Sequence, residues 1–388
     1  MPKKILTFLL AVCLLIPIAL IPSGAVTGSA ESVDAAALDP DCISAVLMEA
    51  STGKVLYEKN PDQPLPPASV TKIMTLLLIM EAIDGGKLKW NDTVTASANA
   101  ASMGGSQIFL KEGEQMTVED LVKSVVVASA NDAAVALAEH IAGSEEVFVA
   151  RMNERAKALG MKNTHFENTN GLDDTAVNHV TSARDIAIMS RELIKHRKIL
   201  DFSGIWMDTI RGGTFGLTNT NRLIRFYKGA TGLKTGSTSK AKFCISATAE
   251  RDGMELIAVI MAAPSRDVRN NAAKTLLDWG YANFSVYNPE VKLPENIAVS
   301  GGCEEICRIS ADDFSAVIPK NSDSKVQIKI DIPEKLSAPV EKGSRIGSII
   351  FTLDGETIGE APVKATDSVK KMGYTDAFRK ILAYFLGK

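Results

Sequence analysis

Three short sequence strings constrain the fold of this chain most strongly. They can form a single reactive site only if the fold brings them close together in space. They are SVTK at residues 69–72, SAN at residues 129–131 and KTG at residues 234–236, in that order. An acyl-transfer site needs a nucleophilic hydroxyl, a lysine to manage its proton, a polar relay and a cation near a substrate carboxylate. Each string alone is common, so the prediction depends on the ordered set.

The first string is expected at the start of a helix. Pro66 and Pro67 stop an extended segment, and Ser69 opens a helical run over residues 70–83 that ends at Gly85-Gly86. Ser69 and Lys72 are i and i+3 in the first turn, where free N–H groups favour a serine alkoxide or oxyanion. Partial desolvation would lower the pKa of Lys72 and make it a usable base. The alternative is an N-cap serine beside a solvated lysine.

The second string is expected in a loop between two helices. An apolar helical run over residues 118–128 precedes it, and another helix continues through Ile141. The loop would present the Ser129 hydroxyl and the Asn131 amide to a cleft, where they bridge Lys72 and bind substrate. The alternative is a simple helix cap by Asn131 or Asp132.

The third string is expected to begin a strand at the border of the same cleft. A hairpin follows it, with strands over residues 242–249 and 254–263 and a turn at residues 250–253. Gly236 would let a substrate backbone approach closely, while Lys234 and Thr235 hold a carboxylate. The alternative is a glycine-rich surface turn.

With these strings in place, the chain resembles the penicillin-binding D-alanyl-D-alanine carboxypeptidases, the low-molecular-mass serine peptidases of bacterial cell-wall maturation. The similarity runs from about Ile43 to Phe284. It is carried by PASVTKIMT at residues 67–75, THFEN at 164–168 followed by GL at 171–172, GLKTG at 232–236 and LLDWG at 276–280.

The resemblance implies a role for each matching residue. Ser69 would be the nucleophile, Lys72 its general base, and Ser129 and Asn131 the relay and substrate contacts. Lys234, Thr235, Gly236 and, as a further candidate, Arg269 would bind the substrate, with the terminal carboxylate on Lys234 and Thr235. Many relatives have His after the KTG string, where this chain has Ser237, so the details of deacylation stay open.

The implied reaction is removal of the terminal D-Ala from a peptidoglycan stem pentapeptide through an acyl-enzyme on Ser69, which penicillin would also acylate. No cofactor is expected, and four histidines without ligand spacing predict no metal site. His165 is interpreted as structural. Two alternatives remain: a serine β-lactamase, although no ExxLN run lies between the second and third strings, and a non-catalytic wall-binding protein.

The predicted fold class is α/β (α+β), with an antiparallel sheet flanked by helices and then a small β-sandwich. The predicted boundaries are a signal peptide at residues 1–30, a catalytic domain at 31–286, a β-rich domain at 287–368 and an amphipathic helix at 369–388. Short strands are expected at residues 297–300, 307–309, 326–332, 346–353 and 356–363.

Both chain ends predict an exported protein at the outer face of the cytoplasmic membrane. Lys3-Lys4 and an apolar run over residues 5–21 are typical of a signal peptide cleaved after Ala25 or Ala30, with an uncleaved anchor as the alternative. In the tail, apolar residues at i, i+3, i+4 and i+7 from Phe378 predict an interfacial helix, or one packed on the β domain. A net charge of −3 argues against a nucleic-acid partner.

Four cysteines remain after the predicted cleavage: Cys42, Cys244, Cys303 and Cys307. Export permits disulfides, and four cysteines allow three full pairings. Free thiols are equally compatible with the sequence, and none of the four is expected to be the nucleophile.

Overall fold

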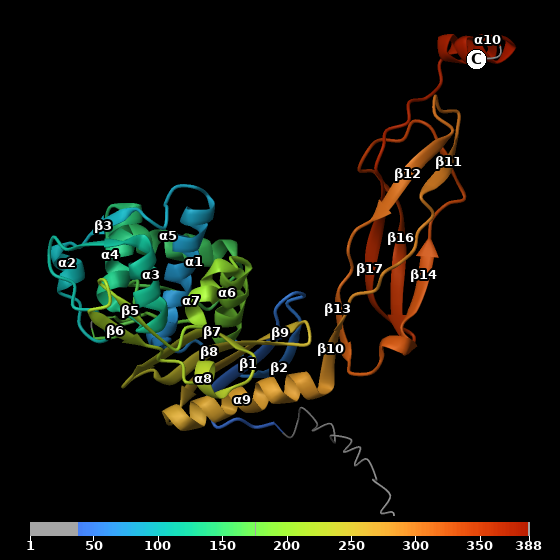
Figure 1. The fold of residues 1–388 in the computed structure, drawn as a ribbon. Helices are drawn as coiled ribbons and strands as arrows, with labels where there is room; N and C mark the ends of the chain where they lie inside the picture. The colour runs from blue at the N-terminus through green and yellow to red at the C-terminus, as the bar shows by residue number, and fades with distance from the viewer. Residues whose placement is uncertain (1–37, 175, 387–388) are drawn as a thin grey trace, which may run out of the picture. The chain divides into compact units, whose positions relative to one another are not determined.

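The structure, a computed structural model, describes residues 38–174 and 176–386. A domain of helices around one sheet is followed along the chain by a β-rich domain and a terminal helix (Figure 1). The signal peptide predicted at residues 1–30 lies outside the described residues.

The first domain is built on a five-stranded antiparallel sheet in the order β2-β1-β9-β8-β7. Its strands are β1 (Ser44–Glu49), β2 (Val55–Lys59), β7 (Ala230–Thr238), β8 (Lys242–Arg251) and β9 (Met254–Ala263). A two-residue turn, Asp252-Gly253, joins β8 to β9, and both of its residues have positive φ, as a type I′ hairpin requires. The first strand of the domain pairs with the last, so the two ends meet in the sheet as predicted.

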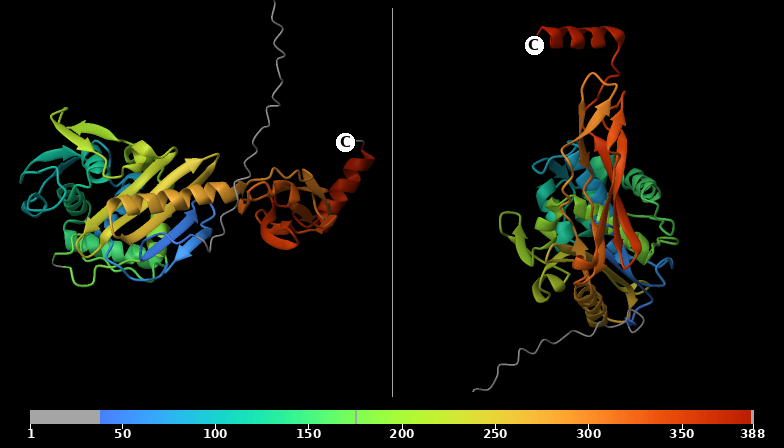
Figure 2. Two further views of the ribbon diagram at one scale, coloured as in Figure 1. Left: turned by 90° about the horizontal axis from the view of Figure 1, so that it is seen from below. Right: turned by 90° about the vertical axis from the view of Figure 1, so that its right-hand side faces the viewer.

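Both faces of this sheet are buried, and the side chains of β9 divide between them with the period of two that a strand imposes. Leu256, Ala258 and Ile260 face the core formed with α9 (Arg266–Asn283), which lies along the sheet in Figure 2. Ile257 and Val259 belong to the larger core on the opposite face. The predicted arrangement, a sheet with helices on both faces, is confirmed.

The helices of the larger core carry the first two sequence strings, residues 69–72 leading into α1 (Lys72–Asp84) and residues 129–131 at the junction of α3 (Val118–Val127) and α4 (Asn131–Ala142). The other helices of this core are α2 (Ala98–Ala101), α5 (Glu145–Ala158), α6 (Ala183–Lys195) and α7 (Lys198–Ser203). The short helix α8 (Leu223–Phe226) packs through Leu223 in the core on the α9 side. The helix expected over residues 70–83 is preceded by a 3₁₀ turn, η2 (Ala68–Thr71), so Ser69 lies in that turn and Lys72 begins α1. Two small hairpins complete the domain: β3 (Thr93–Thr95) with β4 (Gln115–Thr117), and β5 (Met207–Ile210) with β6 (Phe215–Thr218).

The β-rich domain contains a six-stranded sheet in the order β14-β16-β17-β12-β11-β15. Its strands are β11 (Asn296–Ser300), β12 (Ile306–Ala311), β14 (Gln327–Asp331), β15 (Lys335–Ser337), β16 (Arg345–Leu353) and β17 (Glu356–Ala365). A separate pair joins β10 (Phe284–Tyr287) to β13 (Ala316–Pro319). All five expected strands are present. The alternating strand β14 pairs on one side only, with β16, and its residues are exposed rather than half-buried.

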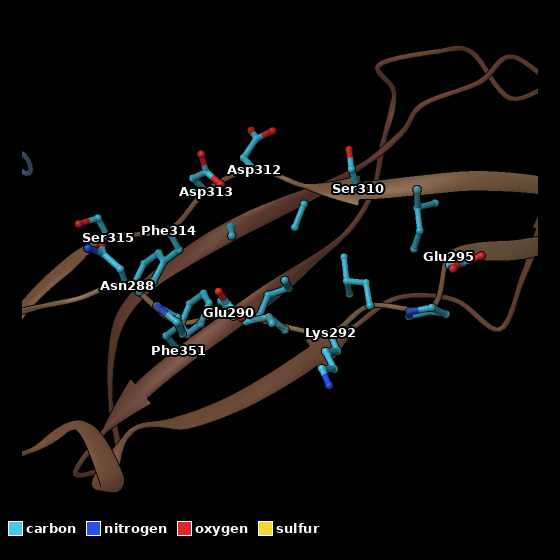
Figure 3. A pocket seen from close by; sticks show the side chains of 18 residues that line it. Asn288, Glu290, Lys292, Glu295, Ser310, Asp312, Asp313, Phe314, Ser315 and Phe351 are labelled. Atoms are coloured by element: carbon cyan, nitrogen blue, oxygen red, sulfur yellow. The ribbon is translucent and has the colours of Figure 1, made fainter.

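A cavity of about 980 Å³ opens in this domain between the segment after β10 and the sheet (Figure 3). Phe314 stacks on Phe351 at its wall, with ring centroids 3.8 Å apart. Carboxylates of Glu290, Asp312 and Asp313 also line it. Ser310, Ser315, Lys292 and Asn288 line it as well, but among the described residues no hydrogen bond joins a lysine amine there to a serine hydroxyl, so this cavity is not the candidate active site.

The terminal helix α10 (Tyr374–Phe385) lies within the segment predicted as an amphipathic helix, residues 369–388, and buries none of its residues. Its apolar side chains Phe378, Ile381, Leu382 and Phe385 are exposed, and Lys380 forms an ion pair with Glu305 at 2.6 Å. Within residues 38–174 and 176–386, no helix is long and apolar enough to cross a membrane.

Candidate active site

The turn that carries Ser69 is held between two glycines from distant parts of the chain. A Cβ on Gly171 would lie 1.9 Å from the Ala68 carbonyl oxygen, and one on Gly236 would lie 2.8 Å from the Ser69 nitrogen. Ala68 itself has φ +50°, a left-handed conformation that costs energy outside glycine. Gly236 was expected to admit a substrate backbone. In the structure, the absence of a side chain at Gly236 lets the turn that carries Ser69 pack closely against strand β7.

Lys72 is fully buried directly below Ser69, and its amine has three oxygen neighbours. Its Nζ lies 2.9 Å from Ser69 Oγ, 2.6 Å from Asn131 Oδ1 and 2.8 Å from the Asn170 carbonyl oxygen. The last two are acceptors only. A neutral amine therefore donates its two hydrogens to them and turns its lone pair to the Ser69 hydroxyl.

The neutral form is favoured by the surroundings. Burial, together with the positive charge of Lys234, holds the pKa of Lys72 well below that of a free lysine, although Asp132 acts in the opposite direction. A neutral lysine within hydrogen-bond distance of a hydroxyl is the arrangement that a general base requires. The geometry of Ser69 and Lys72 therefore meets the requirement for a hydroxyl activated by a neutral amine.

The second string contributes one residue to this network and one to the cleft. Asn131 begins α4, and its amide bridges Lys72 and the Gly104 carbonyl, to which Nδ2 donates at 2.6 Å. Ser129 has φ +63° and lines the cleft. The expected hydrogen bond from Ser129 to Lys72 is not present among the described residues, because Ser69, Asn131 and Asn170 already surround the amine.

The third string lies on β7, at the edge of the sheet, and its side chains alternate between the interior and the cleft. Lys234 is buried below the cleft, with Nζ donating to the Thr235 carbonyl at 3.0 Å, whereas the Thr235 hydroxyl lines the cleft and bonds to Thr220 at 2.8 Å. Burial and the charge of Arg269 lower the pKa of Lys234 to about 7. Lys234 does not line the cleft and can act on a bound group only through its charge, whereas Thr235 can contact that group directly.

The cleft has a volume of about 710 Å³, which is within the usual range for ligand sites. Ser69, Ser129, Thr235, Gly236 and Arg269 all line it, so the structure brings together the cleft-facing residues that the sequence predicted. Arg269 comes from α9 and is itself nearly buried, and its guanidinium donates to Asn270 Oδ1 and to the Cys244 carbonyl.

The sequence did not point to His179, which forms a hydrogen bond to Thr71 in the turn that carries Ser69. The Glu167 backbone N–H donates to His179 Nδ1 at 3.0 Å, so the Nε2–H donates to the Thr71 hydroxyl at 2.7 Å. Burial lowers the pKa of His179 to about 4 and keeps the ring neutral. His165, which the sequence analysis interpreted as structural, is exposed. Its backbone pairs with that of Val180, the residue next to His179. The charge of His165 also acts on the buried ring and adds to the lowering of the His179 pKa. Neither connection is visible in the sequence.

Among the described residues, no cluster of three or more His, Cys, Asp or Glu side chains is placed to hold a metal ion. The four cysteines left open by the sequence, Cys42, Cys244, Cys303 and Cys307, are free thiols in the structure. None of them lines the cleft that contains Ser69.

Comparison with known proteins gives matches to both domains. The family described as D-alanyl-D-alanine carboxypeptidase matches residues 30–265, and the penicillin-binding protein 5 C-terminal domain matches residues 286–371. The chain is 44% identical to the D-alanyl-D-alanine carboxypeptidase DacF of Bacillus subtilis, covering 87% of this chain and 88% of the relative. It is 35% identical to DacC of Escherichia coli, covering 90% and 87%.

Solved structures agree with these matches. Penicillin-binding protein 5 from Haemophilus influenzae is 34% identical, with a TM-score of 0.77, and covers 86% of this chain and 98% of its own. Penicillin-binding protein D2 from Listeria monocytogenes, in an ampicillin-bound form, is 31% identical over 63% of this chain and 99% of its own, with a TM-score of 0.58. These findings confirm the resemblance that the sequence motifs indicated.

Replacing Gly236 by Ala should destabilise the domain, because the new methyl group meets the backbone of Pro67 and Ser69 rather than a movable side chain. We expect a loss of about 1–3 kcal/mol in the free energy of unfolding, measured by denaturant titration. Gly216→Ala is the matched control, since no atom lies within 4 Å of its added Cβ. Equal stability of the two variants would contradict the tight packing of β7 on η2.

His179 should make stability depend on pH. Its folded pKa of about 4 lies below the ordinary value of 6.5, so the unfolded chain binds the proton more readily. The stabilisation is therefore complete above pH 6.5 and is lost as the pH falls toward 4. Between pH 7 and pH 4, wild type should lose about 3 kcal/mol more unfolding free energy than His179→Gln, measured by denaturant titration. Parallel pH profiles would be inconsistent with a buried neutral ring.

Proposed function

The chain belongs to the D-alanyl-D-alanine carboxypeptidase family, and from this premise we propose that it removes the terminal D-Ala from peptidoglycan stem pentapeptides. The observation that carries the proposal is the buried Lys72 amine, 2.9 Å from the Ser69 hydroxyl at the base of the cleft. We further propose that β-lactams acylate the same serine. An ampicillin-bound relative of similar fold supports this proposal.

In the acylation step, neutral Lys72 takes the proton of Ser69 as Oγ attacks the carbonyl carbon of the penultimate D-Ala. The tetrahedral oxyanion is stabilised by the N–H groups of Ser69 and Ser237, and each such donor is typically worth about 3–4 kcal/mol of barrier. The C–N bond then breaks, and D-Ala leaves as an amine after receiving a proton that originated on Ser69. The penultimate D-Ala remains bound to Ser69 as an ester.

The remaining residues hold the reacting groups in place. Asn131 fixes the Lys72 amine through its 2.6 Å contact and orients the lone pair toward Ser69. Ser129 lines the cleft and its hydroxyl has no hydrogen bond to another described residue, so in this proposal it is free to carry the proton from Lys72 to the leaving nitrogen once substrate is bound. Thr235 and Arg269 bind the terminal carboxylate, while the charge of Lys234 acts from beneath.

Hydrolysis of the ester requires a water molecule whose proton is removed as it attacks. Lys72 is neutral again once its proton has gone to the leaving amine, so it can serve as the base a second time. A β-lactam also forms an ester on Ser69, but its leaving nitrogen stays attached through the opened ring. That tethered group keeps water from the ester carbon, so the adduct persists.

We also propose that the enzyme works outside the cytoplasm, at the surface of the cytoplasmic membrane. The exposed apolar side chains of α10 (Phe378, Ile381, Leu382 and Phe385) support this, because an unburied amphipathic helix gains free energy at a lipid interface. The leader predicted from the sequence is the other basis for export.

Ser69→Ala should abolish both release of D-Ala from a pentapeptide and covalent labelling by penicillin, since both need the same oxygen. Free D-Ala and intact-protein mass are the measurements. Ser106→Ala is the matched control, because Ser106 lines the same cleft and should keep both reactions. An adduct on the Ser69 variant, or an adduct that turns over within seconds without D-Ala release, would argue against the proposal.

Removing residues 374–388 should abolish binding to anionic phospholipid vesicles while leaving soluble pentapeptide hydrolysis within twofold. Co-sedimentation of the mature protein, with and without the tail, measures the first and D-Ala release the second. A Phe378→Ser/Phe385→Ser variant keeps the length and charge of the tail. If that variant binds vesicles as well as wild type, the apolar face of α10 is not the membrane contact.

A further inference from the structure

The cleft contains more positively charged side chains than are needed to bind one carboxylate. Three arginines line it, Arg222, Arg266 and Arg269, and none of its lining residues is Asp or Glu. Lys234 lies beneath the same wall. In the proposed reaction, Thr235, Lys234 and Arg269 already serve the terminal carboxylate, which leaves Arg222 and Arg266 without a role.

The side chains of these two arginines make no polar contact that would stabilise the fold among the described residues. Both are exposed, and neither guanidinium has a hydrogen bond or ion pair with any residue that the structure describes. Arg225, three residues later in α8, is also exposed, but its guanidinium lies over two aromatic rings. It stacks on Trp206 at 5.6 Å and on Phe226 at 5.5 Å, and it does not line the cleft.

Both arginines lie next to the carboxylate-binding residues rather than the nucleophile. Arg222 follows Thr220, whose hydroxyl accepts from Thr235 at 2.8 Å. Arg266 is the first residue of α9, three positions before Arg269 and therefore on the same face of the helix. Burial and the nearby charges of Arg266 and Arg222 lower the pKa of Arg269 to about 10, which reflects how closely the three cations are grouped.

The surrounding wall suits a short side chain that ends in an anion. Trp206 and Phe226 pack edge to face at 6.2 Å and line the cleft beside the arginines. The Trp206 indole N–H is buried and has no acceptor among the described residues, so one further donor in this wall is unsatisfied. The first turn of α9 adds its own positive end.

We propose that Arg222 and Arg266 form a second anion subsite, which accepts a side-chain carboxylate on the leaving D-residue. The enzyme then releases acidic terminal D-amino acids, such as D-Glu, more efficiently than their neutral isosteres. This inference rests on the proposed carboxypeptidase function, since it concerns the residue that the same reaction expels. The methyl group of D-Ala does not reach the subsite, so the ordinary substrate does not use it.

The test compares stem pentapeptides that end in D-Ala-D-Glu and D-Ala-D-Gln, which differ in charge but hardly in shape. Wild type should favour the D-Glu peptide by about tenfold or more in kcat/KM, corresponding to about 1.4 kcal/mol. In the Arg222→Gln/Arg266→Gln variant the ratio should fall to near one. Arg225→Gln, which removes the same charge from the adjoining helix α8, should keep the wild-type ratio.

A second readout does not require turnover. The two peptides compete with penicillin for Ser69, and the D-Glu peptide should protect wild type at about tenfold lower concentration, but not the double variant. A wild-type ratio near one in both assays would overturn the subsite. So would an equal loss of preference in Arg225→Gln, which would indicate only a general field. Failure of the carboxypeptidase proposal is seen separately, as absence of D-Ala release from D-Ala-D-Ala by wild type.

Discussion

The catalytic domain depends on keeping one lysine amine out of water. A charged group buried alone is very costly, so Lys72 stays buried either as a neutral amine or with every hydrogen bonded. The structure provides both conditions, since Asn131 and the Asn170 carbonyl accept its hydrogens and Ser69 completes the set. The turn, the α3–α4 loop and the loop at residue 170 must therefore all be in place before the amine can act.

A series of neighbouring cations sets the electrostatics of the cleft. Burial is the main cause of the lowered pKa of both Lys234 and Lys72; the charge of Arg269 adds to it at Lys234, and the charge of Lys234 adds to it at Lys72. A carboxylate bound as proposed, beside Thr235 and Arg269, would relieve this repulsion at Lys234 first. In that proposal, substrate binding and the proton affinity of Lys72 are coupled through charge.

Much of this could be predicted from the sequence, and the parts that could not have a common physical origin. Strand alternation, helix periodicity and the turn at Asp252-Gly253 are local signals, and the sheet and its main helices follow from them. The family motifs gave Ser69 and Lys72. The sequence could not reveal that Lys234 points into the interior, that Asn170 supplies a carbonyl, or that His179 supports Thr71, because these contacts join segments far apart in the chain. The exposure of β14 was missed for a related reason, since alternation predicts a strand but not whether its second edge is paired.

The pairing of β1 with β9 has a consequence for how the molecule is made. Ser44, among the first residues of the domain, faces Met261, which lies near its end. Until β9 has emerged, the hairpin of β1 and β2 keeps an unpaired edge and two uncovered apolar faces. Contacts of such long sequence separation are slow to form, because loop closure must precede any gain from packing. The sheet can therefore close only after nearly the whole domain is available.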